Sequence, residues 1–125
     1  MDRISFAEQM WEELLSMLYE GKVVSTFKGK ATFTVVSFSD NGIEVRIASK
    51  TNEKKSLSRK VMMNAIYKLI DHIDGVRQKM VDPESRLKLG LLSLLPSTEK
   101  VRKVEAKRSV LYLILTSETR KKLTE

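Results

Sequence analysis

The stretch ATFTVVSFSDNGIEVRIAS, from Ala31 to Ser49, together with the helix-like segment 58–73, decides the fold of this chain. Two runs rich in β-branched and aromatic residues flank Ser-Asp-Asn-Gly, which is typical of a hairpin turn because Asn and Gly tolerate positive φ. Apolar and polar residues alternate strictly from Ile43 to Ile47, which indicates a strand with one buried face and one exposed face. The sequence therefore predicts two antiparallel strands, 31–38 and 43–49, whose apolar face packs on a helix.

A helix and another strand are predicted ahead of this hairpin. Residues 5–20 carry apolar side chains at helical spacing, with Ser5 as the N-terminal cap and Gly21 as the C-terminal cap. Residues 22–28 are rich in β-branched residues and predict a first strand. The sheet is thus expected to be a three-stranded antiparallel meander, and the sequence leaves room for a short edge strand at 54–57.

The second half of the chain predicts more helix than strand. Ser58 is expected to cap a helix over 58–73, and Asp82-Pro83 has the residues of a helix start, with Asp as the cap and Pro in the first turn. Further elements are expected as a leucine-rich helix at 83–95, a strand at 109–116 covered on both faces, and a short helix at 118–123. Residues 100–106 fit helix and strand equally well. The fold class is α+β, with all 125 residues in a single domain.

Composition excludes several classes of protein. The chain has no cysteine and one histidine, His72, so disulfides, thiolate metal sites and multi-histidine zinc sites are excluded. No apolar run reaches the roughly 18 residues needed to cross a bilayer, and acidic residues interrupt the N-terminal segment, unlike in a signal peptide. The expectation is a cytoplasmic protein without a membrane partner.

The charge is large and unevenly distributed. The net charge is +7, yet residues 1–20 hold one base and five acids, which leaves 22 bases against 11 acids in the remainder. A basic body behind an acidic first helix favours attraction to a polyanion. We expect the bases to converge on one cationic wall opposite the acidic helix.

No pattern of residues supports catalysis. Asp40 and Glu44 have a spacing compatible with a metal-dependent nuclease, but a turn aspartate and a surface glutamate explain both, and no third ligand is evident. His72 with Asp71 and Asp74 reads as a helix end. The five glycines are scattered singly, so a phosphate-binding loop is absent. The prediction is a non-enzyme that has no cofactor, no metal and no evident small-molecule substrate.

The basic clusters are the remaining functional signal. A helix N-terminus flanked by Lys and Arg suits a phosphate, and two clusters on one face would follow a nucleic-acid backbone. The few aromatic residues read as core, so duplex DNA is favoured over stacked single strands. The candidate nucleic-acid-binding residues are Arg46, Lys50, Lys54, Lys55, Arg59, Lys60, Lys100, Arg102, Lys103, Lys107 and Arg108.

A protein–protein interaction module is the alternative. The apolar stripe of the first helix is wide and contains Trp and Met, and the third helix has an excess of leucine, as an adaptor, inhibitor, assembly subunit or homodimer would need. For the stripe of the first helix, burial in the protein's own core is the favoured interpretation, and Met10, Trp11 and Met17 are the candidate interface residues of the alternative.

Overall fold

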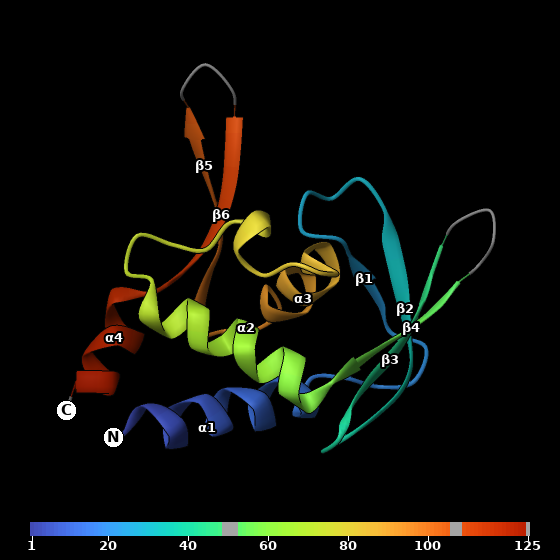
Figure 1. The fold of residues 1–125 in the computed structure, drawn as a ribbon, viewed down its shortest axis with the longest axis horizontal. Helices are drawn as coiled ribbons and strands as arrows, with labels where there is room; N and C mark the ends of the chain where they lie inside the picture. The colour runs from blue at the N-terminus through green and yellow to red at the C-terminus, as the bar shows by residue number, and fades with distance from the viewer. Residues whose placement is uncertain (49–52, 106–108, 125) are drawn as a thin grey trace.

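The computed structural model describes residues 1–48, 53–105 and 109–124, arranged as four α-helices, one short 3-10 helix and two antiparallel sheets (Figure 1). The α+β fold class is confirmed. The helices are α1 (Arg3–Ser16), α2 (Arg59–Asp71), η1 (Gln78–Met80), α3 (Ser85–Leu92) and α4 (Ser117–Thr124). The strands are β1 (Val23–Ser25), β2 (Thr32–Ser39), β3 (Gly42–Ile47), β4 (Lys54–Ser58), β5 (Thr98–Glu105) and β6 (Ser109–Leu115).

Strands β1 to β4 form an antiparallel meander in chain order. The predicted three-stranded meander was one strand short, because β4 pairs along its whole length with β3. Alternation sets the register as expected: Ile43, Val45 and Ile47 are buried and the residues between them are not. Strand β1 is much shorter than the predicted 22–28, since the chain turns away from β2 after Ser25.

The β2–β3 hairpin closes through Asp40 and Asn41, since Ser39 pairs with Gly42. Glycine is required at position 42 for two reasons. Its φ is 155°, and a Cβ there would lie 2.6 Å from the carbonyl oxygen of Leu57 on β4. The turn chemistry predicted from the sequence therefore also lets β4 approach β3 closely at this end of the sheet.

Helices cover one face of the meander. Helix α2 contacts β3 and β4 and also packs on α1, while α3 contacts β1. Helix α3 approaches β1 closely at Gly90, where a Cβ would lie 2.6 Å from the carbonyl oxygen of Ser25. The buried apolar side chains form one cluster that extends from Phe6 in α1 to Leu115 in β6. No helix among the described residues has the length and hydropathy needed to span a membrane.

Strands β5 and β6 form a separate two-stranded ribbon that projects from the body (Figure 1). The ambiguous segment 100–106 is therefore strand through Glu105, and Ala106 lies outside the described residues. The expectation that β6 is covered on both faces was wrong. Only Leu113 and Leu115 are buried, and the apolar residues between Val110 and Ile114 on the other face stay partly exposed.

Two predicted helix starts were wrong and one is confirmed. Asp2, rather than Ser5, caps α1, because its Oδ1 accepts the Ser5 backbone N–H at 2.8 Å. Helix α3 begins at Ser85, after Glu84 in the left-handed conformation (φ 58°), so Asp82 is not its cap. Ser58 caps α2 as predicted, accepting the Val61 N–H at 3.3 Å.

The predicted helix ends lay too far along the chain. Helix α1 stops at Ser16 rather than residue 20, and Gly21 lies in the turn before β1 instead of capping the helix. Helix α2 stops at Asp71 and α3 at Leu92, ahead of the predicted residues 73 and 95. Ile73, expected at the end of the buried stripe of α2, is 68% exposed because it follows the last helical turn.

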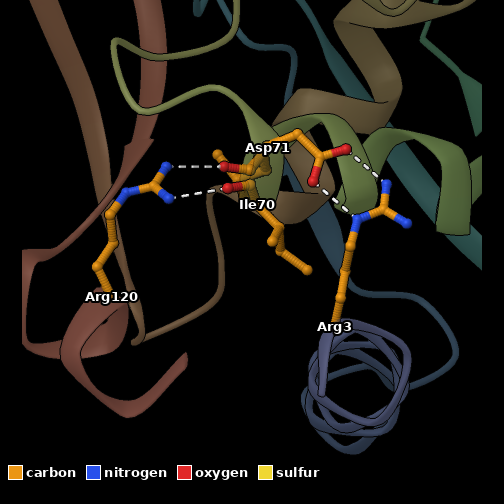
Figure 2. A network of polar contacts seen from close by, with 5 residues as sticks. Arg3, Ile70, Asp71 and Arg120 are labelled. Carbon is orange, nitrogen blue, oxygen red and sulfur yellow. Dashed lines mark hydrogen bonds and ion pairs between the residues drawn. The ribbon is translucent and has the colours of Figure 1, made fainter. Parts of the chain in front are cut away.

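Arginines from both ends of the chain hold the C-terminal end of α2 (Figure 2). The Arg120 guanidinium donates to the carbonyl oxygens of Ile70 at 2.8 Å, His72 at 3.1 Å and Leu69 at 3.2 Å. These carbonyls lie where a helix has no internal donors left, and a cation there also suits the helix dipole. Burial lowers the pKa of Arg120, but an arginine stays charged in the physiological range.

Arg3 reaches the same helix end through a side-chain pair (Figure 2). Its Nε and Nη2 donate to the two oxygens of Asp71 at 2.8 and 2.5 Å, and its guanidinium lies 4.2 Å from the ring centre of Tyr67. These hydrogen bonds lower the pKa of Asp71 below its ordinary value of 3.8. The carboxylate therefore contributes stability above that value, and the contribution is lost as the pH falls through the lowered pKa.

We expect Arg3→Ala to lower the free energy of unfolding only slightly at neutral pH, because both partners of the ion pair are about half exposed. The difference from the wild type should shrink as the pH falls through the lowered pKa of Asp71, because the carboxyl group is then neutral in both proteins. Urea unfolding followed by circular dichroism at neutral pH and over a series of acidic pH values measures this. A difference independent of pH would mean that the stacking of Arg3 on Tyr67, rather than the ion pair, carries the effect.

Candidate nucleic-acid interface

The first group of predicted bases surrounds the start of α2. Arg46 and Lys54 are cross-strand neighbours on β3 and β4. Lys55 is the next residue of β4, and Arg59 and Lys60 are the first two residues of α2. The sequence grouped Lys54, Lys55, Arg59 and Lys60 at this helix start and placed Arg46 on the exposed face of the sheet. It missed the carboxylates that the fold places among them.

Three of these bases form ion pairs. Lys54 Nζ lies 2.8 Å from Glu44, and Arg59 Nη1 lies 2.7 Å from Asp40. Lys55 Nζ lies 3.2 Å from Glu53 and 3.5 Å from Glu84.

The carboxylates decide what this group offers to a polyanion. The hydrogen bond to Glu53, with the charges of Glu53 and Glu84, raises the pKa of Lys55, so the lysine is fully charged but compensated. A phosphate approaching any of the three bases meets a carboxylate within hydrogen-bonding distance of it, and the attraction is largely cancelled. Lys60, the last base of this group, is exposed and has no ion pair with a described residue.

The second group lies on β5. Lys100, Arg102 and Lys103 are all exposed, as are Val101 and Val104 between and beside them. Successive side chains of a strand point to opposite faces, so five consecutive exposed residues mean that neither face of this part of β5 is buried. Arg102 lies 3.2 Å from Glu99, while Lys100 and Lys103 have no ion pair with a described carboxylate. We call Lys100–Val104 with its ribbon the basic arm.

The two groups do not form the single wall that the charge distribution suggested. Figure 1 shows β4 and the start of α2 on one side of the body and the arm projecting from another, with its outer end directed away from α1. The arm thus lies opposite the acidic helix α1, as expected for the basic residues, but the group around the start of α2 does not. Lys50, Lys107 and Arg108 lie outside the described residues.

The predicted partner interface on α1 is largely inside the protein. Met10 and Trp11 are 2% and 0% exposed, and Met17 is partly buried against the same core. The wide apolar stripe arises because α1 packs on α2 and also reaches the β2–β3 turn. In α3, every leucine from Leu87 to Leu92 is buried too, so these two stripes fill the core of one chain.

Asp40 has a role that the sequence did not reveal. Its Oδ1 accepts the Trp11 indole N–H at 3.2 Å and also contacts Arg59 Nη1. A buried indole N–H needs an acceptor, and this turn residue supplies it. Glu44, the other acid of the nuclease-like pair, is engaged by Lys54. In the part of the chain that the structure describes, no group of three or more His, Asp or Glu side chains could hold a metal ion.

No known protein family matches this sequence, and no curated protein or solved structure is significantly similar to the chain.

Proposed function

We propose that this protein binds nucleic acid, with duplex DNA as the favoured form, through the phosphate backbone and by means of the basic arm. The observation that supports this most strongly is the exposure of Lys100, Arg102 and Lys103 on a ribbon that projects away from the acidic helix α1. Lys100 and Lys103 on this ribbon are exposed and have no ion pair with a described carboxylate, whereas Lys54, Lys55 and Arg59 near α2 are paired with carboxylates.

The shape of the arm also fits the proposal. A two-stranded antiparallel ribbon is narrow enough to enter the major groove of B-DNA, which is about 12 Å wide. Side chains on both faces of such a ribbon can contact the phosphates of the two groove walls. The arm carries no exposed Trp, Phe or Tyr among Lys100–Val104, so base stacking is not its mode of binding.

The salt dependence of binding tests the proposal. Bases that neutralise three to five phosphates release that number of condensed counterions, so a plot of log affinity against log salt should have a slope of about −3 to −4.5. Fluorescence anisotropy with a labelled 20-base-pair duplex between about 50 and 200 mM NaCl measures it. An absence of binding at the lowest salt, or a slope near zero, would contradict backbone binding.

A further inference from the structure

A groove unconnected with the basic arm runs between α2 and the segment 81–83. Its volume is about 600 Å³, and its lining includes Asn64, Tyr67 and Lys68 from α2, Val81 and Pro83 from the segment, and Lys88 from α3. Arg3 and Asp71, already paired with each other, also line it. Apolar and polar groups share the walls, as in sites for small polar ligands.

Lys88 is the unusual residue of this groove. It is 5% exposed, and its Nζ donates to the carbonyl oxygen of Val81 at 3.1 Å. An ammonium group has three N–H donors, and the described residues supply an acceptor for one of them. Buried charges in proteins are normally paired with an opposite charge, because leaving water is costly for an ion. Lys88 forms no ion pair with any described carboxylate.

A second ammonium group lies beside it. Lys68 Nζ donates to the carbonyl oxygen of Met80, the residue next to the acceptor of Lys88. Lys68 is exposed and likewise has no ion pair with a described residue. Burial lowers the pKa of Lys88 below its ordinary value of 10.5, and the charge of Lys68 lowers it further, while Glu84 and Asp82 raise it. The two like charges are therefore close enough to interact, and each ammonium group is hydrogen-bonded to a backbone carbonyl.

None of the described acids near the groove forms an ion pair with either lysine. Asp71 accepts hydrogen bonds from Nε and Nη2 of Arg3, and Glu84 lies 3.5 Å from Lys55. Asp82 lines the groove but lies beyond ion-pair distance of both lysines. Apart from the paired Arg3 and Asp71, the charged side chains that line the groove are Lys68, Lys88 and Asp82. Two positive charges therefore face one negative charge, and the region between the two ammonium groups is positive.

We propose that this groove binds a small oxyanion, a phosphate or a carboxylate group, between the ammonium groups of Lys68 and Lys88. The oxygens accept hydrogen bonds from N–H groups that the carbonyls of Met80 and Val81 leave unused, and such charge-assisted hydrogen bonds are the strong ones in proteins. Asn64 on α2 lines the same groove and offers an amide donor to a further oxygen. The ligand is a free small molecule, because the lysines lie in a groove bounded by two helices and a loop rather than on the projecting arm.

Inorganic phosphate and acetate are the probes. Each is titrated to about 50 mM into the ¹⁵N-labelled protein, with NaCl adjusted to keep the ionic strength constant. Saturable shifts of the amide resonances around Val81 and Lys88 are expected with at least one probe. We expect Lys88→Met and Lys68→Gln each to weaken that binding about tenfold or more, since each removes one charged donor. The matched control is Lys60→Gln, an exposed lysine of α2 that does not line the groove, and it should leave binding unchanged.

Three results would overturn the proposal. The first is that neither probe shifts the groove amides of the wild-type protein, a result that does not depend on any variant being folded. The second is that Lys68→Gln and Lys60→Gln weaken binding equally, which would make binding a general surface effect. The third is that duplex DNA shifts the groove amides while both small probes fail to do so. These outcomes do not test the proposed binding of DNA by the arm, because the bases of the arm are unchanged in every variant.

Discussion

A variant with Lys100, Arg102 and Lys103 all changed to Ala is expected to lose about 30-fold in affinity for duplex DNA at about 0.1 M salt. Each phosphate neutralised by a base contributes roughly 1 kcal/mol at that salt through counterion release, and the variant removes two bases without an ion pair to a described carboxylate, Lys100 and Lys103, while Arg102 is paired with Glu99. The slope of log affinity against log salt should become shallower by about 2 for the same reason. Anisotropy titrations of both proteins against one duplex measure the two quantities.

The control variant changes Lys54, Lys55 and Arg59 to Ala and so removes the same formal charge. Because those three bases are paired with Glu44, Glu53 and Asp40, we expect at most about a threefold loss of affinity. Equal losses in the two variants would show that net charge matters and that the arm does not. Circular dichroism spectra and urea midpoints of both variants establish that each is folded.

The largest effect on stability is expected at Trp11. This side chain is completely buried, and Trp11→Ala should lower the free energy of unfolding by about 3–5 kcal/mol, because a large cavity replaces an aromatic ring. A chain of this size has only about 5–15 kcal/mol of net stability, so the variant would be marginally folded. Urea unfolding monitored by circular dichroism gives the value.

Trp11→Phe separates packing from the hydrogen bond to Asp40. It keeps most of the apolar volume and removes the indole N–H, so the expected loss is smaller than for Trp11→Ala. Asp40→Ala, which leaves the buried N–H without its acceptor, should cost about 1–3 kcal/mol. If Trp11→Ala were as stable as the wild type and changed the oligomeric state instead, Trp11 would belong to a partner interface, as the sequence alone suggested.

The β2–β3 hairpin was predictable because local chemistry and tertiary packing agree there. Alternation from Ile43 to Ile47 gives the register, and Asp40-Asn41-Gly42 gives the turn. The conformation of 100–105 was not predictable, since Val101 and Val104 have helical spacing and the neighbouring charges favour no state. Pairing with the apolar strand β6 decides it, and that pairing is tertiary.

The candidate site was predictable only as a set of charges. The sequence shows which residues are basic, but compensation depends on contacts across strands and loops: Arg59 meets Asp40, 19 residues away. The burial of Lys88 could not be predicted from the sequence for the same reason. A lysine within a leucine-rich helix reads as solvent-facing, and only the packing of the 81–83 segment over α3 makes it buried.

The most direct test of binding through the arm is an NMR titration of the ¹⁵N-labelled protein with a short duplex at low salt. The predicted result is that the amide resonances of Lys100 to Val104 shift most, while those of Lys54 to Lys60 shift little. Shifts centred on Lys54 to Lys60, or no shifts at any ratio of DNA to protein, would contradict the account.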